Sequence, residues 1–351
     1  MSKSRRYSIV GLCALLLIVL ITWYFSRATP VAVPPAIAHG YSKALKQAHN
    51  GEPGAARVLY QQLARPDLSD ERRAALHAEL PNYPSQALKL ADKDLANESP
   101  RVREAAIRSI VGLVPTGQRT LLLGPLLEDA EQSVRFAAAN ALLGLSPDTL
   151  GLYFGPLQQV LDEFVKTLKA QPETAESWIQ LARLYIHSAL LPEAQNALEQ
   201  AMRLQPDNLQ AVVAQIELLD KQGKTDESRQ LLARQLAAHP ESAYLQHALG
   251  MWLLHHGERP YALLGLSKAV ELEPDNQDYR YDLATTLHAQ QELEAAQRQL
   301  EEIIQRHPAN RKARVLLVNY WKESGQLQNV QVLLAQLEQQ NPDDPALQQG
   351  L

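Results

Sequence analysis

The chain has 351 residues and a formal net charge of −5, with 34 Lys and Arg residues against 39 Asp and Glu residues. Charges of both signs are mixed along it, so the sequence has no basic patch of the kind that binds nucleic acid. The single cysteine, Cys13, excludes intramolecular disulfides and any cysteine-based metal cluster.

The first expected element is an apolar helix near the N-terminus. A short basic tail, residues 1–6, precedes an uncharged run over residues 7–26. A helix of that length, rising about 1.5 Å per residue, spans a hydrocarbon core of about 30 Å. The basic residues ahead of it favour a cytoplasmic N-terminus. We therefore expect a single-pass transmembrane signal-anchor in a bacterial inner membrane, with the rest of the chain in the periplasm. A cleaved signal peptide is the alternative.

The soluble portion is expected to begin after a spacer. Residues 27–40 contain Pro30, Pro34 and Pro35 and predict a semi-rigid, extended linker. Helical hairpins are expected over residues 41–83. The composition of the chain supports helices, because Ala, Leu, Gln and Glu dominate and Phe and the β-branched residues are scarce.

A 32-residue repeat covers residues 84–150. Its first copy contains Leu95, Val102-Arg103, Ala105-Ala106, Gly112-Leu113 and Pro115, and its second copy contains Leu127, Val134-Arg135, Ala137-Ala138, Gly144-Leu145 and Pro147. The Val-Arg-x-Ala-Ala element resembles HEAT repeats. Two such units are too few to bury a core alone, so we expect them to pack on flanking helices.

A second repeat has a period of 34 residues. Prolines fall at this interval at Pro172, Pro206, Pro240, Pro274, Pro308 and Pro342, and the unit before Pro206 contains Trp178, Leu181, Ala182, Tyr185, Ala194, Leu198 and Ala201. This pattern resembles the tetratricopeptide repeat family. The resemblance implies five units of two antiparallel helices over residues 175–344, after a half-repeat helix over 156–172 and before a tail over 345–351. It also implies packing roles for Trp178, Tyr185 and Trp321.

The expected fold is therefore an all-α, right-handed helical solenoid of HEAT-like hairpins followed by five tetratricopeptide units. The sequence has no glycine-rich phosphate loop, no His-Glu-x-x-His and no Gly-x-Ser-x-Gly, so we expect no enzyme activity, cofactor or small-molecule substrate. His247, Met251 and His255 share one helical stripe, but the two histidines are about 12 Å apart along the axis, too far to bind one metal ion.

The resemblance places a partner-binding groove on the first helix of each unit. The positions that line the groove in this family are occupied here by Arg183, Glu217, Tyr244, His247, Met251, Tyr281, Thr285, His288, Asn319 and Lys322. Tyr244 and Tyr281 are the expected aromatic anchors for a partner protein or peptide. The predicted function is that of a membrane-anchored scaffold, adaptor or assembly factor. The alternative is a constitutive structural subunit of a bacterial envelope, respiratory, exopolysaccharide or secretion complex.

Overall fold

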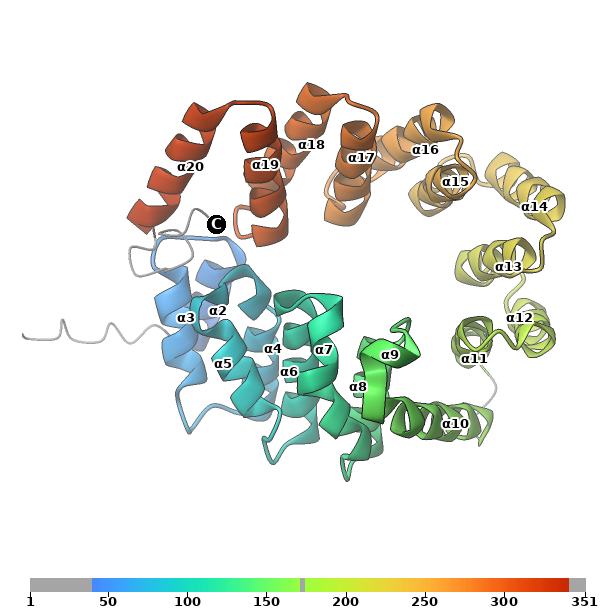
Figure 1. The fold of residues 1–351 in the computed structure, drawn as a ribbon, viewed down its shortest axis with the longest axis horizontal. Coiled ribbons are helices and arrows are strands. Elements are labelled where there is room, and N and C mark those ends of the chain that lie inside the picture. Colours follow the sequence, from blue (N-terminus) through green and yellow to red (C-terminus); the bar gives the residue numbers. More distant parts are fainter. Residues whose placement is uncertain (1–39, 171–173, 341–351) are drawn as a thin grey trace, which may run out of the picture. The chain divides into compact units, whose positions relative to one another are not determined.

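The computed structural model describes residues 40–170 and 174–340 (Figure 1). The chain divides into one unit over Met1–Gly40 and a second over Tyr41–Leu351, and all described helices belong to the second. Helices and their connecting loops make up the described chain, which contains no strand, so the predicted all-α class is confirmed. The tail 1–6, the apolar run 7–26, all but the last residue of the linker 27–40 and the tail 345–351 lie outside the described residues.

No helix within the described ranges is long and apolar enough to cross a membrane. The longest, α10 (Phe154–Ala170), has 17 residues and carries Asp162, Glu163 and two lysines, whereas spanning a bilayer takes about 20 predominantly apolar residues. This finding overturns the expected localisation in a bacterial inner membrane with a periplasmic repeat region. The run 7–26, from which we had expected an anchor, is not among the described residues.

Helices of unequal length and short 3-10 turns form the first half of the described chain. Prolines begin several of them, because the first turn of a helix does not use the backbone N–H that proline lacks. The elements are α2 (Tyr41–His49), α3 (Ala55–Leu63), α4 (Asp70–His77), η1 (Leu80–Asn82), α5 (Pro84–Asp94), α6 (Pro100–Leu113), η2 (Thr116–Gln118), α7 (Arg119–Leu123), η3 (Gly124–Glu128), α8 (Gln132–Leu142), α9 (Pro147–Leu150), η4 (Gly151–Tyr153) and α10, where η marks a 3-10 turn.

The two copies of the 32-residue repeat make equivalent contacts through an arginine. Arg103 donates to the carbonyl of Asn97 (2.7 Å) and to Asp129 Oδ1 (2.7 Å). Arg135 donates to the carbonyl of Asp129 (2.8 Å) and to Glu163 Oε2 (3.1 Å). Each arginine therefore connects the loop before its own helix to a carboxylate from a following element.

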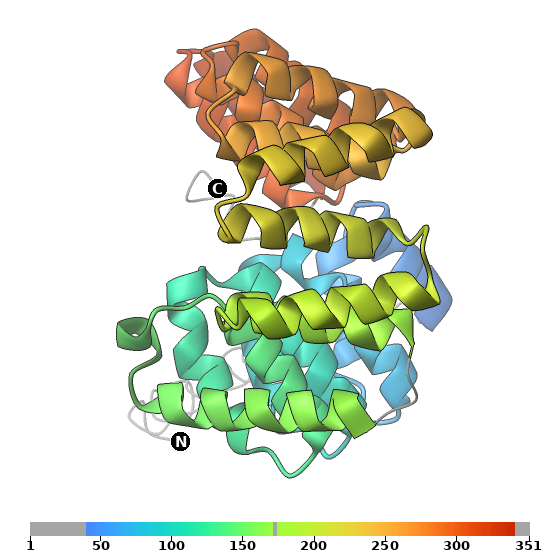
Figure 2. The same cartoon turned by 90° about the vertical axis from the view of Figure 1, so that its right-hand side faces the viewer.

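The second half repeats with a constant length. The first helices of its units start at intervals of 34 residues, and so do the second helices. The first helices are α11 (Ala175–His187), α13 (Leu209–Lys221), α15 (Ala243–His255), α17 (Gln277–Ala289) and α19 (Arg311–Glu323). The second helices are α12 (Leu191–Leu204), α14 (Thr225–Ala238), α16 (Arg259–Leu272), α18 (Leu293–Arg306) and α20 (Leu327–Gln340). The two kinds of helix alternate along the stack (Figures 1 and 2).

Local sequence sets these helix starts. Thr174, Asn208, Ser242, Asn276 and Asn310 each precede a first helix and accept a hydrogen bond on the side-chain oxygen from a backbone N–H of its first turn. Such a cap satisfies a donor that has no partner within the helix and contributes about 1 kcal/mol. The caps are 34 residues apart, so every unit begins at the same point of the repeat.

Small residues lie where the two helices of a unit approach most closely. A Cβ atom on Gly250 of α15 would lie 2.6 Å from Leu266 Cγ of α16, and one on Gly265 would lie 2.8 Å from the carbonyl oxygen of Gln246. Among the predicted packing aromatics, Tyr185 and Trp321 are buried and Trp178 packs against the core while partly exposed. The core therefore runs between neighbouring helix pairs.

Candidate functional site: a pocket between two first helices

A pocket of about 540 Å³ lies between α13 and α15. Four of the predicted groove residues line it: Glu217, Tyr244, His247 and Met251. The remaining lining residues are Val213, Ile216, Asp220, Lys221, Ala248, Trp252 and His255. Because the units repeat in one register, the groove positions of two consecutive first helices face the same opening.

The pocket combines apolar walls with polar groups at its edges. Ile216 is buried, whereas the Met251 side chain is 42% exposed and available for contact. Trp252 is partly buried, and its indole Nε1 donates to Ser228 Oγ of α14 (3.1 Å). Glu217 and Lys221 of α13 are exposed. An apolar pocket with a few fixed polar groups is the usual form of a site that accepts a partner's side chain.

Tyr244, which lines the pocket, lies near enough to Arg183 of α11 to feel its charge, although Arg183 is not among the lining residues. Burial raises the pKa of Tyr244 above its ordinary value, and the nearby charge of Arg183 opposes that shift. Arg183 is itself exposed on α11. The sequence assigned both residues to the groove, and the structure brings them close enough for the guanidinium to influence the phenol.

His247 is held by the next unit. Its Nε2 lies 2.8 Å from Asp282 Oδ2 of α17, and its ring stacks on Tyr279 with the ring centroids 4.6 Å apart. The imidazole is therefore oriented by α17 while it lines the pocket on α15. A partner group that reaches His247 meets a ring fixed in position rather than a mobile side chain.

The same relationship recurs one unit later. His288 Nε2 lies 2.7 Å from Glu323 Oε2 of α19, and its ring stacks on Tyr320 with the ring centroids 3.8 Å apart. In the other direction along the stack, His256 Nε2 lies 3.1 Å from Asp220 Oδ2 of α13 and its ring centroid is 4.1 Å from that of Trp252. Imidazole–carboxylate pairs thus connect α13 with the residue that follows α15, α15 with α17, and α17 with α19.

Tyr281 is less available than a groove anchor should be. It packs against the core formed by α17 to α20, and the ammonium of Lys312 lies 3.7 Å from its ring centroid. Thr285 is also occupied, since its Oγ1 donates to the carbonyl of Asp282 (3.0 Å). Asn319 and Lys322 of α19 are exposed. These four residues lie outside the pocket, and their role in binding remains a prediction.

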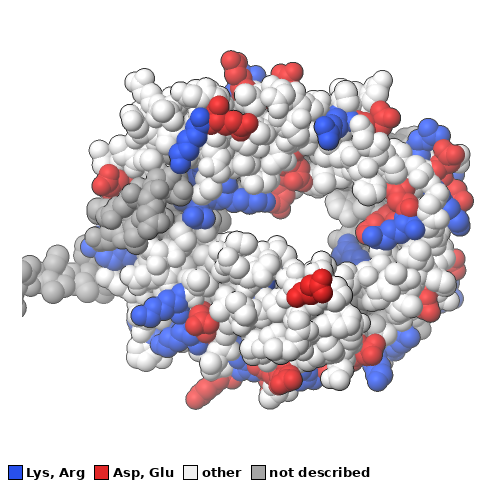
Figure 3. Space-filling model, in the orientation of Figure 1, with Lys and Arg blue, Asp and Glu red and all other residues white. Residues whose placement is uncertain are grey.

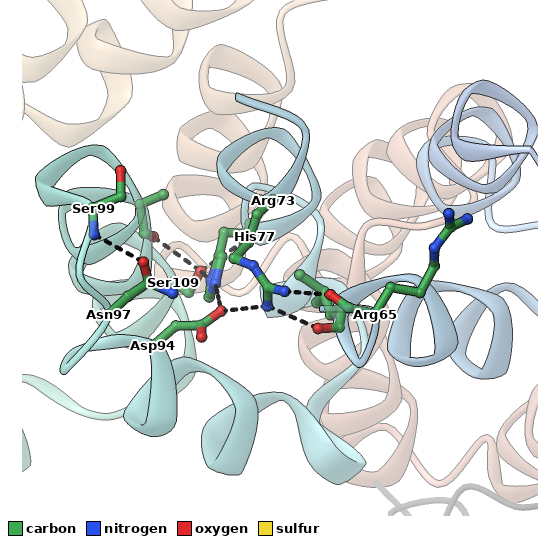
Figure 4. A network of polar contacts seen from close by, with 9 residues as sticks. Arg65, Arg73, His77, Asp94, Asn97, Ser99 and Ser109 are labelled. Carbon is green, nitrogen blue, oxygen red and sulfur yellow. Dashed lines mark hydrogen bonds and ion pairs between the residues drawn. The ribbon is translucent and has the colours of Figure 1, made fainter. Parts of the chain in front are cut away.

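One polar cluster contains the three residue types of a hydrolytic triad (Figure 4). Ser109 Oγ lies 3.1 Å from His77 Nδ1, and His77 Nε2 lies 2.9 Å from Asp94 Oδ2, which Arg73 also contacts at 3.2 Å. His77 is fully buried and Ser109 is 2% exposed, so neither is accessible to a substrate. The cluster connects α4, α5 and α6. No sequence motif pointed to it, because its members are spread over more than thirty residues.

Two observations on the described residues concern metal ligands and surface charge. Among the described residues no group of three His, Cys, Asp or Glu side chains is placed to hold a metal ion. On the face shown in Figure 3, basic and acidic side chains are interspersed. Protein surfaces that bind nucleic acid gather Lys and Arg on one face.

Two stretches of the second half match known repeats. Residues 190–251 and 262–332 each match a model of the tetratricopeptide repeat. The chain carries tetratricopeptide (TPR) repeats. The first match contains the pocket residues from Val213 to Met251. Both matches lie beyond residues 84–150 and leave the HEAT-like section as a prediction. TPR proteins generally mediate protein–protein interactions.

Proteins of known sequence or structure are similar to this chain over different shares of its length. The uncharacterized protein y4yS of Sinorhizobium fredii is 29% identical over 101 residues, 29% of this chain and 56% of that protein, so the chain spans about half the length of this curated relative. Yeast Tom70 superimposes with a TM-score of 0.49 at 14% identity, over 91% of this chain and 64% of that chain. A thermophilic TPR protein of Thermus thermophilus, TTC0263, gives 0.40 at 20% identity, over 58% of this chain and 98% of that chain.

Proposed function

We propose that the chain is an adaptor or assembly factor whose TPR units bind a segment of a partner protein at the pocket between α13 and α15. The observation that supports this most directly is the pocket itself, where Tyr244, Met251 and Trp252 offer partly exposed apolar surface beside polar groups. Aromatic and Met side chains at a concave site are typical anchors for a protein segment.

The pocket suits one bulky side chain of a partner, while the backbone of the partner on either side of that residue lies along α13 and α15. An aliphatic or aromatic group would contact Met251 and Trp252, and the fixed imidazole of His247 and the phenol of Tyr244 would supply hydrogen bonds. Such a combination fits an extended or helical segment, bound by a few anchors and a polar rim. We assign no catalytic step to the pocket. The cluster of Ser109, His77 and Asp94 is buried, and its residues lie on α4 to α6 rather than on α13 and α15.

We also infer that residues 84–150 form HEAT-like units that extend the stack. The equivalent contacts of Arg103 and Arg135 support this, since each joins its own preceding loop to a carboxylate from a following element. Replacing Arg103 by Ala should speed amide exchange around Asn97 and Asp129 together. Unchanged exchange in both loops would contradict a repeat built on these contacts.

The binding proposal is tested by photo-crosslinking in the cells that make the protein. A photoreactive amino acid at position 251 should give discrete adducts with a partner, identified by mass spectrometry. The matched control is position 261 on α16, where Tyr261 is 61% exposed but lies outside the pocket. Adducts shared by both positions, or found only at 261, would count against the pocket. A single partner captured in constant proportion would favour a structural subunit over an adaptor with several clients.

A further inference from the structure

The loop before α19 is buried against the loop between α2 and α3. Ala309 is 4% exposed and belongs to the same apolar cluster as Ala48, Ala55 and Leu59 of the first hairpin. A Cβ atom on Gly51 would lie 2.8 Å from the backbone nitrogen of Ala309. Gly51 has a φ of +65°, which side chains disfavour, so glycine serves both the turn and the close approach here.

Two further contacts lie beside this one. The backbone N–H of Arg311 points to Asn82 Oδ1, at a long distance of 3.5 Å, and α19 contacts the η1 turn. Burial raises the pKa of Tyr83, and the charge of Arg314 opposes that rise, which places the guanidinium near this tyrosine. The fifth TPR unit therefore meets both the loop of the first hairpin and the η1 turn with Tyr83, although more than two hundred residues separate Arg311 from Asn82.

The fifth unit departs from its own repeat at this point. The residue that follows the proline is Asp207, Glu241 or Asp275 in the preceding units, and all three are exposed. In the fifth unit the equivalent residue is Ala309. An acidic side chain there would lose its hydration when it is buried against Gly51, which costs free energy even though the Arg314 guanidinium donates to the carbonyl of residue 309. The sequence thus lacks the usual carboxylate at the one loop of this kind that is covered by the first hairpin.

The contact is small in relation to the cores on its two sides. Helices α17 to α20 have a core cluster of their own, and Ala309 is the one described residue beyond Leu218 in the cluster that contains the first hairpin. At this contact the fifth unit contributes the buried Ala309, the long hydrogen bond from the Arg311 N–H and the charge of Arg314 near Tyr83. Because Ala309 is a single residue of one cluster and does not belong to the other, we expect both cores to persist when this contact separates.

From these observations we propose that the first hairpin and the fifth TPR unit form an intramolecular latch, centred on Gly51 and Ala309, that opens without unfolding either part. The pocket between α13 and α15 lies between these two residues along the chain. While the latch is closed, both ends of the segment that carries the pocket are fixed. The effect that we infer on binding rests on the proposed function. The restraint would hold the pocket in the conformation that binds a partner and lower the conformational entropy lost on binding.

The test is a distance measurement by pulsed electron spin resonance in the full chain, with Cys13→Ser and spin labels at positions 57 and 301, both exposed. With the latch closed we expect a narrow distance distribution. Ala309→Asp, which restores the residue type of the other units, should broaden it and shift it to longer distances. The control Gln305→Asp adds the same charge at an exposed position of α18 and should leave the distribution unchanged. Circular dichroism of each variant reports whether the helices persist.

Gly51→Ala opens the latch from the other side and keeps the test decisive if Ala309→Asp does not fold. A folded Ala309→Asp or Gly51→Ala variant with the original distribution would overturn the proposal, as would equal broadening by Gln305→Asp. None of these results depends on partner binding. A latch that fails therefore leaves the binding proposal standing, and the reverse also holds.

Discussion

His247 and Asp282 join the third and fourth TPR units, with the imidazole Nε2 2.8 Å from the carboxylate Oδ2. The side chains are 20% and 35% exposed, and the ring of Tyr279 stacks on the histidine. The pair holds a pocket residue of one unit against the helix of the next. It therefore links the geometry of the binding face to the packing of the stack.

The first prediction is that this pair contributes a measurable coupling energy. A double-mutant cycle with His247→Ala and Asp282→Ala should give about 0.5–1 kcal/mol in urea denaturation. The control pair Glu294 and Arg298 lies within one helix, is 87% and 65% exposed and should give a coupling near zero. Equal coupling energies in the two cycles would show that the contact between units contributes no more to stability than an exposed pair within one helix.

The second prediction concerns the buried carboxylate of Asp94. Burial by itself raises the pKa of Asp94, but the hydrogen bond from His77 and the charge of Arg73 outweigh burial and hold it below its ordinary value of 3.8. A lowered pKa means that the ionised carboxylate stabilises the fold above about pH 4, and that this contribution is lost as the pH falls through the folded-state pKa.

Asp94→Asn should therefore lower the free energy of unfolding by about 3 kcal/mol at pH 7, because Arg73 is left without its buried partner. The loss relative to the unmodified chain should shrink when both are unfolded at pH 3. Asp92→Asn, at an exposed position of the same helix, serves as the control and should have little effect at either pH. A loss for Asp94→Asn that does not change with pH would contradict the assignment.

The third prediction uses two helical glycines with opposite surroundings. Alanine favours a helix over glycine by up to about 1 kcal/mol. At Gly265, however, a Cβ atom would lie 2.8 Å from a backbone carbonyl oxygen, whereas at Gly155 of α10 nothing lies within 4 Å. Gly265→Ala should destabilise the protein by about 1–3 kcal/mol, and Gly155→Ala should be neutral or slightly stabilising. The melting temperatures of both variants test this prediction. A higher melting temperature for Gly265→Ala would mean that α15 and α16 are not in close contact.

Much of the second half could be predicted because its signals are local. The capping residues, the small residues and the prolines return every 34 residues, so each unit repeats the same local pattern for two helices. The pairing of His247 with Asp282 was missed because it joins two units. A signal for it exists, since His288 has the same spacing to Tyr320 and Glu323 that His247 has to Tyr279 and Asp282.

Other features depend on contacts that no local pattern reports. Tyr281 falls at a groove position of the repeat, yet Lys312 covers its ring. Ala309 stands out in the sequence against the acidic residues of the other units, but its partner Gly51 lies in a different kind of helix pair. The expected inner-membrane localisation was inferred from the basic tail 1–6 and the apolar run 7–26, and the described helices provide no spanning segment.

Binding of a partner segment at the pocket between α13 and α15 is best tested by measuring the affinity of that segment. With the partner segment identified by crosslinking, its Kd should be measured by calorimetry for the original chain and for Tyr244→Ala, Met251→Ala and Tyr261→Ala. We expect at least tenfold weaker binding for the two pocket variants, about 1.4 kcal/mol, with unchanged binding for Tyr261→Ala and little change in melting temperature. Unchanged affinity for both pocket variants, or an equal loss for Tyr261→Ala, would contradict it.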